Sequence, residues 1–177
     1  HQTRVWFSDD GHHWSDSIDI GDPDVWIWRI TWHQGVAYGI GYSTGTDCFL
    51  RLYRSEDGIH FTTHVDRLYD TGYANETSIV FMEDGTALCL LRRDDENPVL
   101  HTAQLGQSAP PYTEWIWKDL GIRFGGPHMV HLPDGRLIAA GRQYQYGGTD
   151  QRRTVLCLLD PEAVTLEEMV CLPSGGD

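Results

Sequence analysis

A hairpin signal recurs along this chain at a fixed interval. Its glycines stand at Gly35, Gly85 and Gly135, so consecutive signals are 50 residues apart. Each glycine lies between two apolar runs, such as TSIVFM before Gly85 and TALCLL after it. A glycine turn between such runs is a strong signal for a β-hairpin, and a repeat of this length is typical of proteins built from stacked units. The turns are His33-Gln34-Gly35, Glu83-Asp84-Gly85 and Pro133-Asp134-Gly135.

A second motif interleaves with the hairpin signal. Residues 8–14 read SDDGHHW and residues 55–61 read SEDGIHF, so the form Ser-x-Asp-Gly-x-x-aromatic recurs after 47 residues. Together the two repeats give a unit of four strands in about 50 residues. The hairpin supplies the first two strands, and the Asp motif connects the third strand to the fourth. Residues 161–169 could form a helical turn, but they stand where the last such connection is expected.

The apolar runs place the strands of three such units, and helical periodicity is nearly absent. A strand is expected where β-branched and aromatic residues gather between turn residues. We expect strands over residues 26–33, 36–43, 48–55 and 59–65, then 76–82, 86–92, 98–104 and 114–118, then 126–132, 136–142, 153–160 and 166–172.

Four-stranded units repeating at this length predict an all-β fold, a β-propeller of four-stranded antiparallel blades. Residues 1–177 are predicted to form one partial propeller domain, with blades near 24–66, 74–120 and 124–173 and outer strands of a preceding blade near 1–20. Propellers have about 4–8 blades, so about three blades predict a part of a ring. A β-solenoid is the competing architecture, and self-association could complete the ring.

Charge and composition exclude several classes of partner. The net charge of −13 argues against nucleic acid and against an anionic membrane surface, and no apolar run is long enough to span a membrane. The first residues show no signal-peptide pattern and begin inside a strand-like run, which indicates that the true start lies upstream. The basic residues are twelve Arg and one Lys. Arginine is the better residue for gripping a carboxylate or phosphate.

No metal or cofactor is expected. The cysteines have no CxxC spacing and are interpreted as buried thiols on strands, although a Cys157–Cys171 disulfide is possible. His128 and His131 stand three apart on an expected strand and so face opposite sides, which makes a poor metal pair. No phosphate loop, dinucleotide fingerprint or catalytic Ser or Cys motif is present.

Charged residues gather at one end of the predicted sheets. In a four-stranded meander the hairpin turns and Asp motifs lie at one end, and the opposite end holds the start of the first strand, the end of the second and the start of the third. Glu76 starts a first strand, while Arg92 and Arg142 end two second strands 50 residues apart. Arg152 and Arg153 start the following third strand. We therefore expect one carboxylate and several arginines to converge on one rim; loop charges or structural ion pairs are the alternative interpretation.

The Asp motif resembles the Asp box, or BNR repeat, of the sialidase (neuraminidase) superfamily of six-bladed β-propellers. An Asp side chain bonds backbone N–H groups in the turn, the glycine takes a positive φ, and the aromatic packs between sheets. This role is structural; a calcium loop at residues 8–16 has the wrong ligand spacing. The matching residues are Ser8, Asp10, Gly11 and Trp14, then Ser55, Asp57, Gly58 and Phe61.

The resemblance covers the whole chain, which is similar to the central part of the family fold. It implies that Glu76 is the base activating a Tyr nucleophile and that Arg92 clamps the substrate carboxylate. Arg153 fits the next family arginine best, with Arg152 one residue off. The Tyr, an Asp and one further Arg would lie outside this chain. Tyr144 is near the rim, in the connection after a hairpin, which is not the place of the nucleophile.

The resemblance implies an exo-glycoside hydrolase that acts on an acidic, sialic-acid-type terminal sugar, with the isolated chain inactive. Trp26 stands 50 residues before Glu76, and Trp26 and Trp28 could wall a sugar site, with packing an equal alternative. A non-catalytic carbohydrate-binding propeller and a protein-interaction propeller are the alternatives. The sequence leaves the compartment undecided; a glycosidase would favour a secreted or periplasmic location over the cytoplasm.

Overall fold

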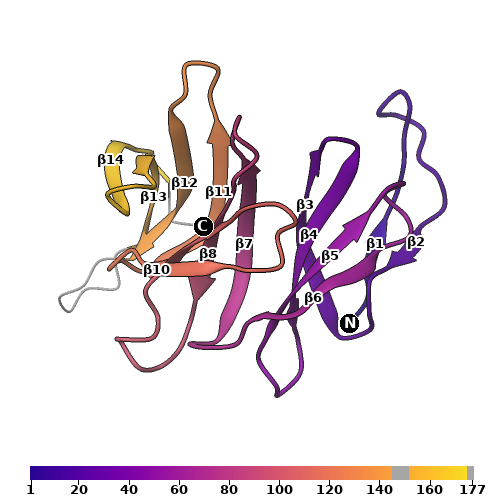
Figure 1. The fold of residues 1–177 in the computed structure, drawn as a ribbon, viewed down its shortest axis with the longest axis horizontal. Coiled ribbons are helices and arrows are strands. Elements are labelled where there is room, and N and C mark those ends of the chain that lie inside the picture. The colour runs from indigo at the N-terminus through magenta and orange to yellow at the C-terminus, as the bar shows by residue number, and fades with distance from the viewer. Residues whose placement is uncertain (145–151, 175–177) are drawn as a thin grey trace. The chain divides into compact units, whose positions relative to one another are not determined.

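The computed structural model describes residues 1–144 and 152–174 and consists of β-strands joined by turns and loops (Figure 1). The chain divides into two compact units, His1–Tyr69 and Asp70–Asp177. No helix among the described residues has the length and apolar character needed to cross a bilayer.

The first unit contains a two-stranded and a four-stranded antiparallel sheet. In the smaller sheet β1 (Thr3–Val5) pairs with β2 (Ile18–Ile20). In the larger sheet each strand pairs with the next along the chain. At its first turn Gln34 and Gly35 both have positive φ, 49° and 79°, while His33 pairs with Val36. A two-residue hairpin loop requires this backbone. The strands are β3 (Val25–His33), β4 (Val36–Ser43), β5 (Leu50–Ser55) and β6 (Thr62–Tyr69).

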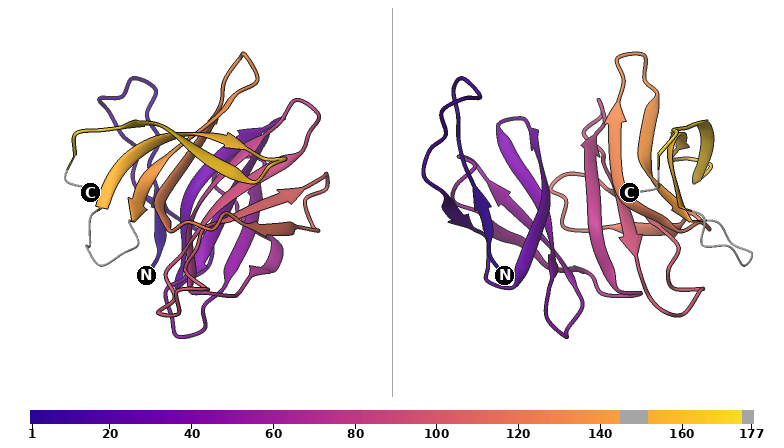
Figure 2. Two further views of the ribbon diagram at one scale, coloured as in Figure 1. Left: turned by 90° about the vertical axis from the view of Figure 1, so that its left-hand side faces the viewer. Right: turned by 180° about the vertical axis from the view of Figure 1, so that it is seen from behind.

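The second unit contains two four-stranded antiparallel meanders, seen from two sides in Figure 2. The innermost strands of the two sheets lie side by side, because the buried hydroxyl of Ser78 on β7 accepts the backbone N–H of Met129 on β11 at 2.9 Å. The first sheet holds β7 (Ala74–Phe81), β8 (Ala87–Arg93), β9 (Gln104–Ser108) and β10 (Ile116–Asp119). The second holds β11 (Phe124–His131), β12 (Leu137–Tyr144), β13 (Arg152–Asp160) and β14 (Thr165–Cys171).

One apolar core joins the two sheets of the second unit. Leu88 and Leu90 of β8 are buried in the same cluster as Met129 of β11 and Val155 of β13. Burying an aliphatic side chain of this size stabilises the fold by roughly 1.5–3 kcal/mol. The core thereby holds the strand ends that project beyond it in a fixed relation to one another.

Eleven of the twelve expected strands are present at nearly the predicted positions, and one prediction was wrong. The expected strand 98–104 is instead a loop followed by β9, which begins at Gln104. Asp95 and Asn97 form side-chain turns here, since Asp95 Oδ1 accepts the N–H of Asn97 and Asn97 Oδ1 accepts that of Val99. Residues 161–164 are a turn leading into β14, as the unit pattern predicted, and not helix.

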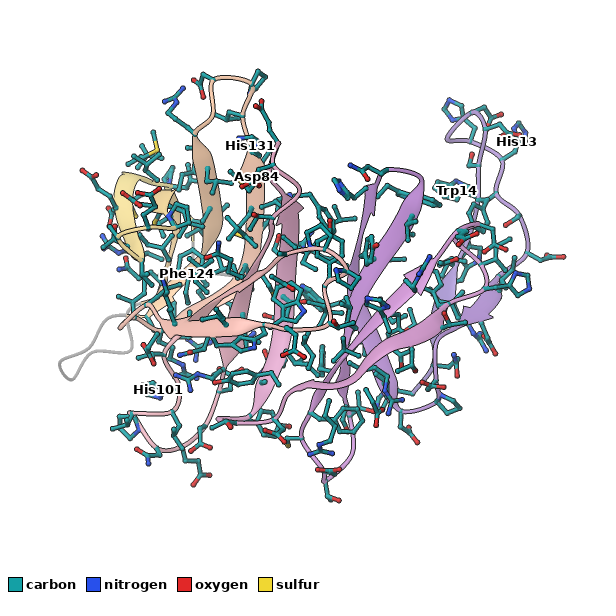
Figure 3. The ribbon with its side chains drawn as sticks, viewed as in Figure 1. His13, Trp14, Asp84, His101, Phe124 and His131 are labelled. Atoms are coloured by element: carbon teal, nitrogen blue, oxygen red, sulfur yellow. The ribbon has the colours of Figure 1, made fainter. Side chains whose placement is uncertain are left out.

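The two Ser-x-Asp-Gly turns have the same hydrogen bonds. Asp57 Oδ1 accepts the N–H groups of Ile59 and His60 at 2.9 and 2.8 Å, and Asp10 Oδ1 accepts those of His12 and His13 at 2.8 Å each. The His60 ring, which lies 2.6 Å from Asp57 Oδ2, and these backbone bonds hold the pKa of Asp57 far below its ordinary value, and the backbone N–H and ring of His13 do the same for Asp10. The aromatic residues differ: Phe61 packs against the core of the first unit, whereas Trp14 is 61% exposed on the loop between β1 and β2 (Figure 3). The two short strands beside Trp14 offer it little surface to pack on.

The cysteines are all free, so the possible Cys157–Cys171 disulfide is not present. Cys171 lies opposite Val155, and a register shift places Cys157 opposite Glu168. Cys89 and Cys157 are buried thiols, as expected, whereas Cys48 is half-buried and Cys171 is exposed.

Candidate functional site: an arginine cluster at the strand ends

Charged side chains meet at one end of the two sheets of the second unit. This is the end opposite the hairpin turns, which Figure 3 marks with the labels of Asp84 and His131. The side chains come from the start of β7, the ends of β8 and β12, the start of β13, and the residues just after β8 and just before β11. We call this set the arginine cluster. It consists of Glu76, Arg92, Asp94, Arg123, Arg142, Tyr144 and Arg152.

Glu76 and Arg92 form the ion pair that the hairpin predicted. Arg92 Nη1 lies 2.6 Å from Glu76 Oε2, and both side chains are mostly buried, at 18% and 15% exposure. The same Glu76 oxygen accepts the backbone N–H of Gly126 on β11 at 2.8 Å, which ties the two sheets together at this end. Burial alone would lower the pKa of Arg92, but the hydrogen bond to Glu76 and the charges of Asp94 and Glu76 outweigh it and raise that pKa.

Asp94 is a second carboxylate within the cluster. Its Oδ2 lies 2.7 Å from Arg92 Nε, at an angle unsuited to a hydrogen bond, and its Oδ1 accepts a hydrogen bond from Arg123 Nη2 at 2.9 Å. Asn75 also donates to Asp94, at 3.0 Å. Burial raises the pKa of Asp94, but Arg123, Arg92 and Asn75 together hold it below its ordinary value. Asp94, in the loop directly after β8, is therefore a mostly buried partner of the arginines, at 19% side-chain exposure.

Tyr144, the last residue of β12, lies among the four arginines. Its hydroxyl accepts a hydrogen bond from Arg142 Nη1 at 3.2 Å and a longer one from Arg92 Nη2 at 3.5 Å. The guanidinium carbon of Arg123 is 4.3 Å from the centre of the Tyr144 ring, and that of Arg152 is 5.7 Å away. Both distances are in the range of cation–π attraction.

Arg153 does not join the cluster, contrary to the residue order that the family resemblance favoured. Arg152 pairs with Tyr144 across the β12–β13 ladder, and Arg153 pairs with Gln143. Because successive side chains of a strand point to opposite faces, Arg153 turns away. Its guanidinium instead bonds Gln143 Oε1 at 2.6 and 3.0 Å and Glu168 Oε2 at 2.5 Å.

Trp26 and Trp28 belong to the first unit, His1–Tyr69. Their rings meet edge to face at 5.5 Å, and Trp26 also lies 5.7 Å from Tyr42, a residue that the sequence did not single out. Trp26 is 43% exposed at the start of β3. Its role as a wall of a sugar site stays a prediction.

The sequence also missed Asp94, Arg123 and the central position of Tyr144. The signal that found Glu76 and Arg92 could have found them, because Asp94 directly follows β8 and Arg123 directly precedes β11. The observed strands extend beyond the expected ranges 86–92 and 126–132, so the residues that flank them differ from those that the sequence indicated.

The other end of the second unit holds a cavity of about 870 Å³. Its lining includes Asp84, Asp134, Glu162 and Lys118. Asp134 already pairs with Arg136 at 2.7 Å. The pKa values of Asp84 and Asp134 are lowered by hydrogen bonds within their own hairpin turns, from Thr86 and from Arg136. These shifts follow from the structure of the turns, so the arginine cluster is the better candidate site.

Comparison with known proteins shows only which fold the chain has. No family model matches it, and no curated protein matches it. Among solved structures, it is similar to a protein of unknown function from Dyadobacter fermentans, with a TM-score of 0.76 at 17% identity over 94% of this chain and 51% of that one. This chain therefore spans about half the length of that structure.

Two sugar-cleaving enzymes have the same fold. An endo-arabinase from Bacteroides thetaiotaomicron aligns with a TM-score of 0.71 at 15% identity, over 97% of this chain and 72% of that one. An α-L-arabinanase from Penicillium chrysogenum, solved with arabinobiose, aligns with a TM-score of 0.69 at 17% identity, over 98% and 60%. With the three meander sheets, these likenesses define the chain as an all-β partial β-propeller of four-stranded antiparallel blades.

Proposed function

We propose that this chain is the central part of a glycoside-hydrolase propeller and that the arginine cluster binds the acidic group of a terminal sugar. One observation carries the proposal: among the described residues the cluster brings together four guanidinium groups and two carboxylates. It is therefore net positive within a chain whose net charge is −13. Arginine forks match a carboxylate with two charge-assisted hydrogen bonds each.

The catalytic part of the proposal rests on Glu76. In a sialidase-like exo-hydrolase, a Tyr hydroxyl attacks the sugar, and its ordinary pKa of ~10 makes it a poor nucleophile at neutral pH. Glu76 would take the phenol proton as the Tyr attacks, and Arg92 would hold the substrate carboxylate. The nucleophile and the acid would come from other parts of the protein. The two arabinanases support the glycoside-hydrolase class, while the acidic sugar rests on the arginine cluster alone.

Binding without hydrolysis is the second candidate, and the surroundings of Glu76 favour it. Glu76 Oε2 already accepts two hydrogen bonds, from Arg92 and from Gly126. These two hydrogen bonds are sufficient for a carboxylate that only holds an arginine in position. The two candidates differ in whether Glu76 Oε1 receives a proton, and Glu76→Gln separates them.

The acidic-sugar proposal is tested by Arg142→Gln in the complete protein. We expect the dissociation constant for N-acetylneuraminic acid to rise at least about tenfold, because a hydrogen bond to a charged group contributes roughly 1.5–3 kcal/mol. Binding of the neutral methyl ester should change little. Titration calorimetry measures both, and Arg136→Gln is the matched control, since Arg136 directly precedes β12 at its other end and pairs with Asp134. Equal affinity of the wild type for acid and ester would remove the proposal.

A further inference from the structure

The hydroxyl of Tyr144 has an unusual set of neighbours for a phenol. Its oxygen accepts N–H groups from Arg92 and Arg142, and its ring lies against Arg123 and Arg152. A Tyr hydroxyl has one hydrogen to donate in addition to its acceptor lone pairs. Among the described residues, no acceptor receives that hydrogen. The phenol therefore presents an O–H donor beside two guanidinium groups.

The position of this hydroxyl is fixed from several sides. Arg123, which lies against the ring, is itself held by Asp94 at 2.9 Å. A Cβ atom added to Gly125 would come within 3.1 Å of the Tyr144 hydroxyl and 3.3 Å of Arg92 Nε. The backbone of β11 thus approaches the phenol so closely that the Cβ atom of any other residue would crowd it. A donor held this firmly loses little freedom when it binds a ligand.

The hydroxyl is a weak acceptor for the N–H groups of Arg92 and Arg142. Its bonds of 3.2 and 3.5 Å are longer than the 2.7–2.9 Å that is typical of guanidinium–carboxylate bonds. A carboxylate is therefore the stronger acceptor for the same N–H groups. A carboxylate in contact with Arg92 and Arg142 would also lie within reach of the Tyr144 O–H, which is bonded to both.

We propose that Tyr144 is a ligand-contacting residue that sets specificity for an acidic sugar: its hydroxyl, positioned by Arg92 and Arg142, donates a hydrogen bond to the carboxylate. This inference rests on the proposed function, because it names a further donor of the same site. It assigns Tyr144 to recognition and not to nucleophilic attack. The selectivity for acid over neutral sugar then depends on a hydroxyl group as well as on the arginines.

The test is Tyr144→Phe in the complete protein, which keeps the ring against Arg123 and Arg152 and removes only the hydroxyl. The probes are N-acetylneuraminic acid and its methyl ester. We expect the dissociation constant for the acid to rise about tenfold and that for the ester to rise less than about twofold, so the ratio of the two affinities falls. Tyr112→Phe is the control, because it loses a hydroxyl bonded to the carbonyl of Gly85 at the turn end, at 3.0 Å.

Three results would overturn the inference, and they are distinguishable. If Tyr144→Phe keeps the wild-type ratio of acid to ester affinity, the hydroxyl makes no contact with the carboxylate, and the proposed function stands without it. If Tyr144→Phe binds the acid more tightly, the hydroxyl occupies the place of the carboxylate and does not assist it. If the wild type itself does not prefer the acid over the ester, the proposed function is wrong, and so is the inference that rests on it. A general loss of folding is recognised separately, because it would lower the affinity for the ester as well, whereas the first of these results leaves the ester affinity at its wild-type value.

Discussion

Glu76→Gln is expected to abolish hydrolysis of an acidic-sugar substrate by the complete protein while leaving binding intact. A glutamine has the shape of glutamate, and its amide oxygen can still accept the N–H groups of Arg92 and Gly126, at 2.6 and 2.8 Å in the wild type. It cannot take a proton from a phenol. Loss of a general base lowers the rate by roughly 10²–10⁴-fold. Because the change also removes a negative charge, affinity for an anion should hold or rise.

The measurement is steady-state release of an aryl leaving group from an α-sialoside, with calorimetric binding of N-acetylneuraminic acid on the same samples. Glu83→Gln is the matched control, since Glu83 is an exposed carboxylate at the turn of the same hairpin, between β7 and β8. A variant with unchanged turnover would refute the role of Glu76 as base. A wild type that binds the acid and hydrolyses nothing would favour the binding propeller.

The fold was predictable because its turn residues recur at a fixed interval along the sequence. Glycines at 35, 85 and 135 fix where each hairpin reverses, and all three have φ between 79° and 88°. The strand that was misplaced lies where the chain departs from the period. Between β8 and β9, Val99 and Leu100 look like strand residues, yet Pro98 has no N–H to give to a sheet and Val99 is 75% exposed. The turn-forming residues of this segment therefore determined its structure more than the apolar character of Val99 and Leu100 did.

The site was predictable only in part. Strand pairing predicts which strand ends lie together, but it does not predict toward which face of the sheet each side chain points. The Glu76–Arg92 contact follows from the hairpin, and the convergence of Arg142 follows from the repeat. The choice between Arg152 and Arg153 depends on register, and a shift of one residue moves a side chain to the other face. The ladder places Arg152 opposite Tyr144, which no spacing in the sequence fixes.

Because side chains alternate between the two faces of a strand, two neighbouring arginines at the end of β8 have different roles. Arg92 points into the arginine cluster, whereas Arg93 is 4% exposed on the other face and holds the loop before β9. Arg93 Nε donates to the carbonyl of Thr102 at 2.6 Å, and its Nη2 lies 2.8 Å from Asp119 Oδ2. One arginine thus serves the proposed ligand site, and the next anchors the loop beside it.

Arg93→Met is accordingly expected to lower the free energy of unfolding by about 2–3 kcal/mol, without changing the preference for acid over ester. Breaking a buried ion pair costs about 3–5 kcal/mol, and a smaller cost is expected here because Asp119 is 47% exposed and its interaction with Arg93 is screened by solvent. Urea unfolding of the complete protein measures the change. Lys118→Met is the control, since Lys118 is the exposed neighbour of Asp119 on β10 and should shift stability by less than about 0.5 kcal/mol. A loss no larger than the control's would show that Arg93 is not an anchor.

The cost of Arg93→Met should also depend on pH. Burial raises the pKa of Asp119, but hydrogen bonds from Thr102, Gly121 and Gln104 and the charge of Arg93 outweigh it and hold that pKa below its ordinary value. A carboxylate whose pKa is lowered by folding stabilises the protein above its unfolded pKa of ~3.9, and this contribution is lost as the pH falls through the folded value. Removing Arg93 brings the folded pKa nearer to the unfolded one. The stability gap between wild type and variant should therefore be full at pH 7 and narrow below about pH 4; a gap that stays constant to pH 3 would mean that Arg93 acts through Thr102 and packing, and not through Asp119.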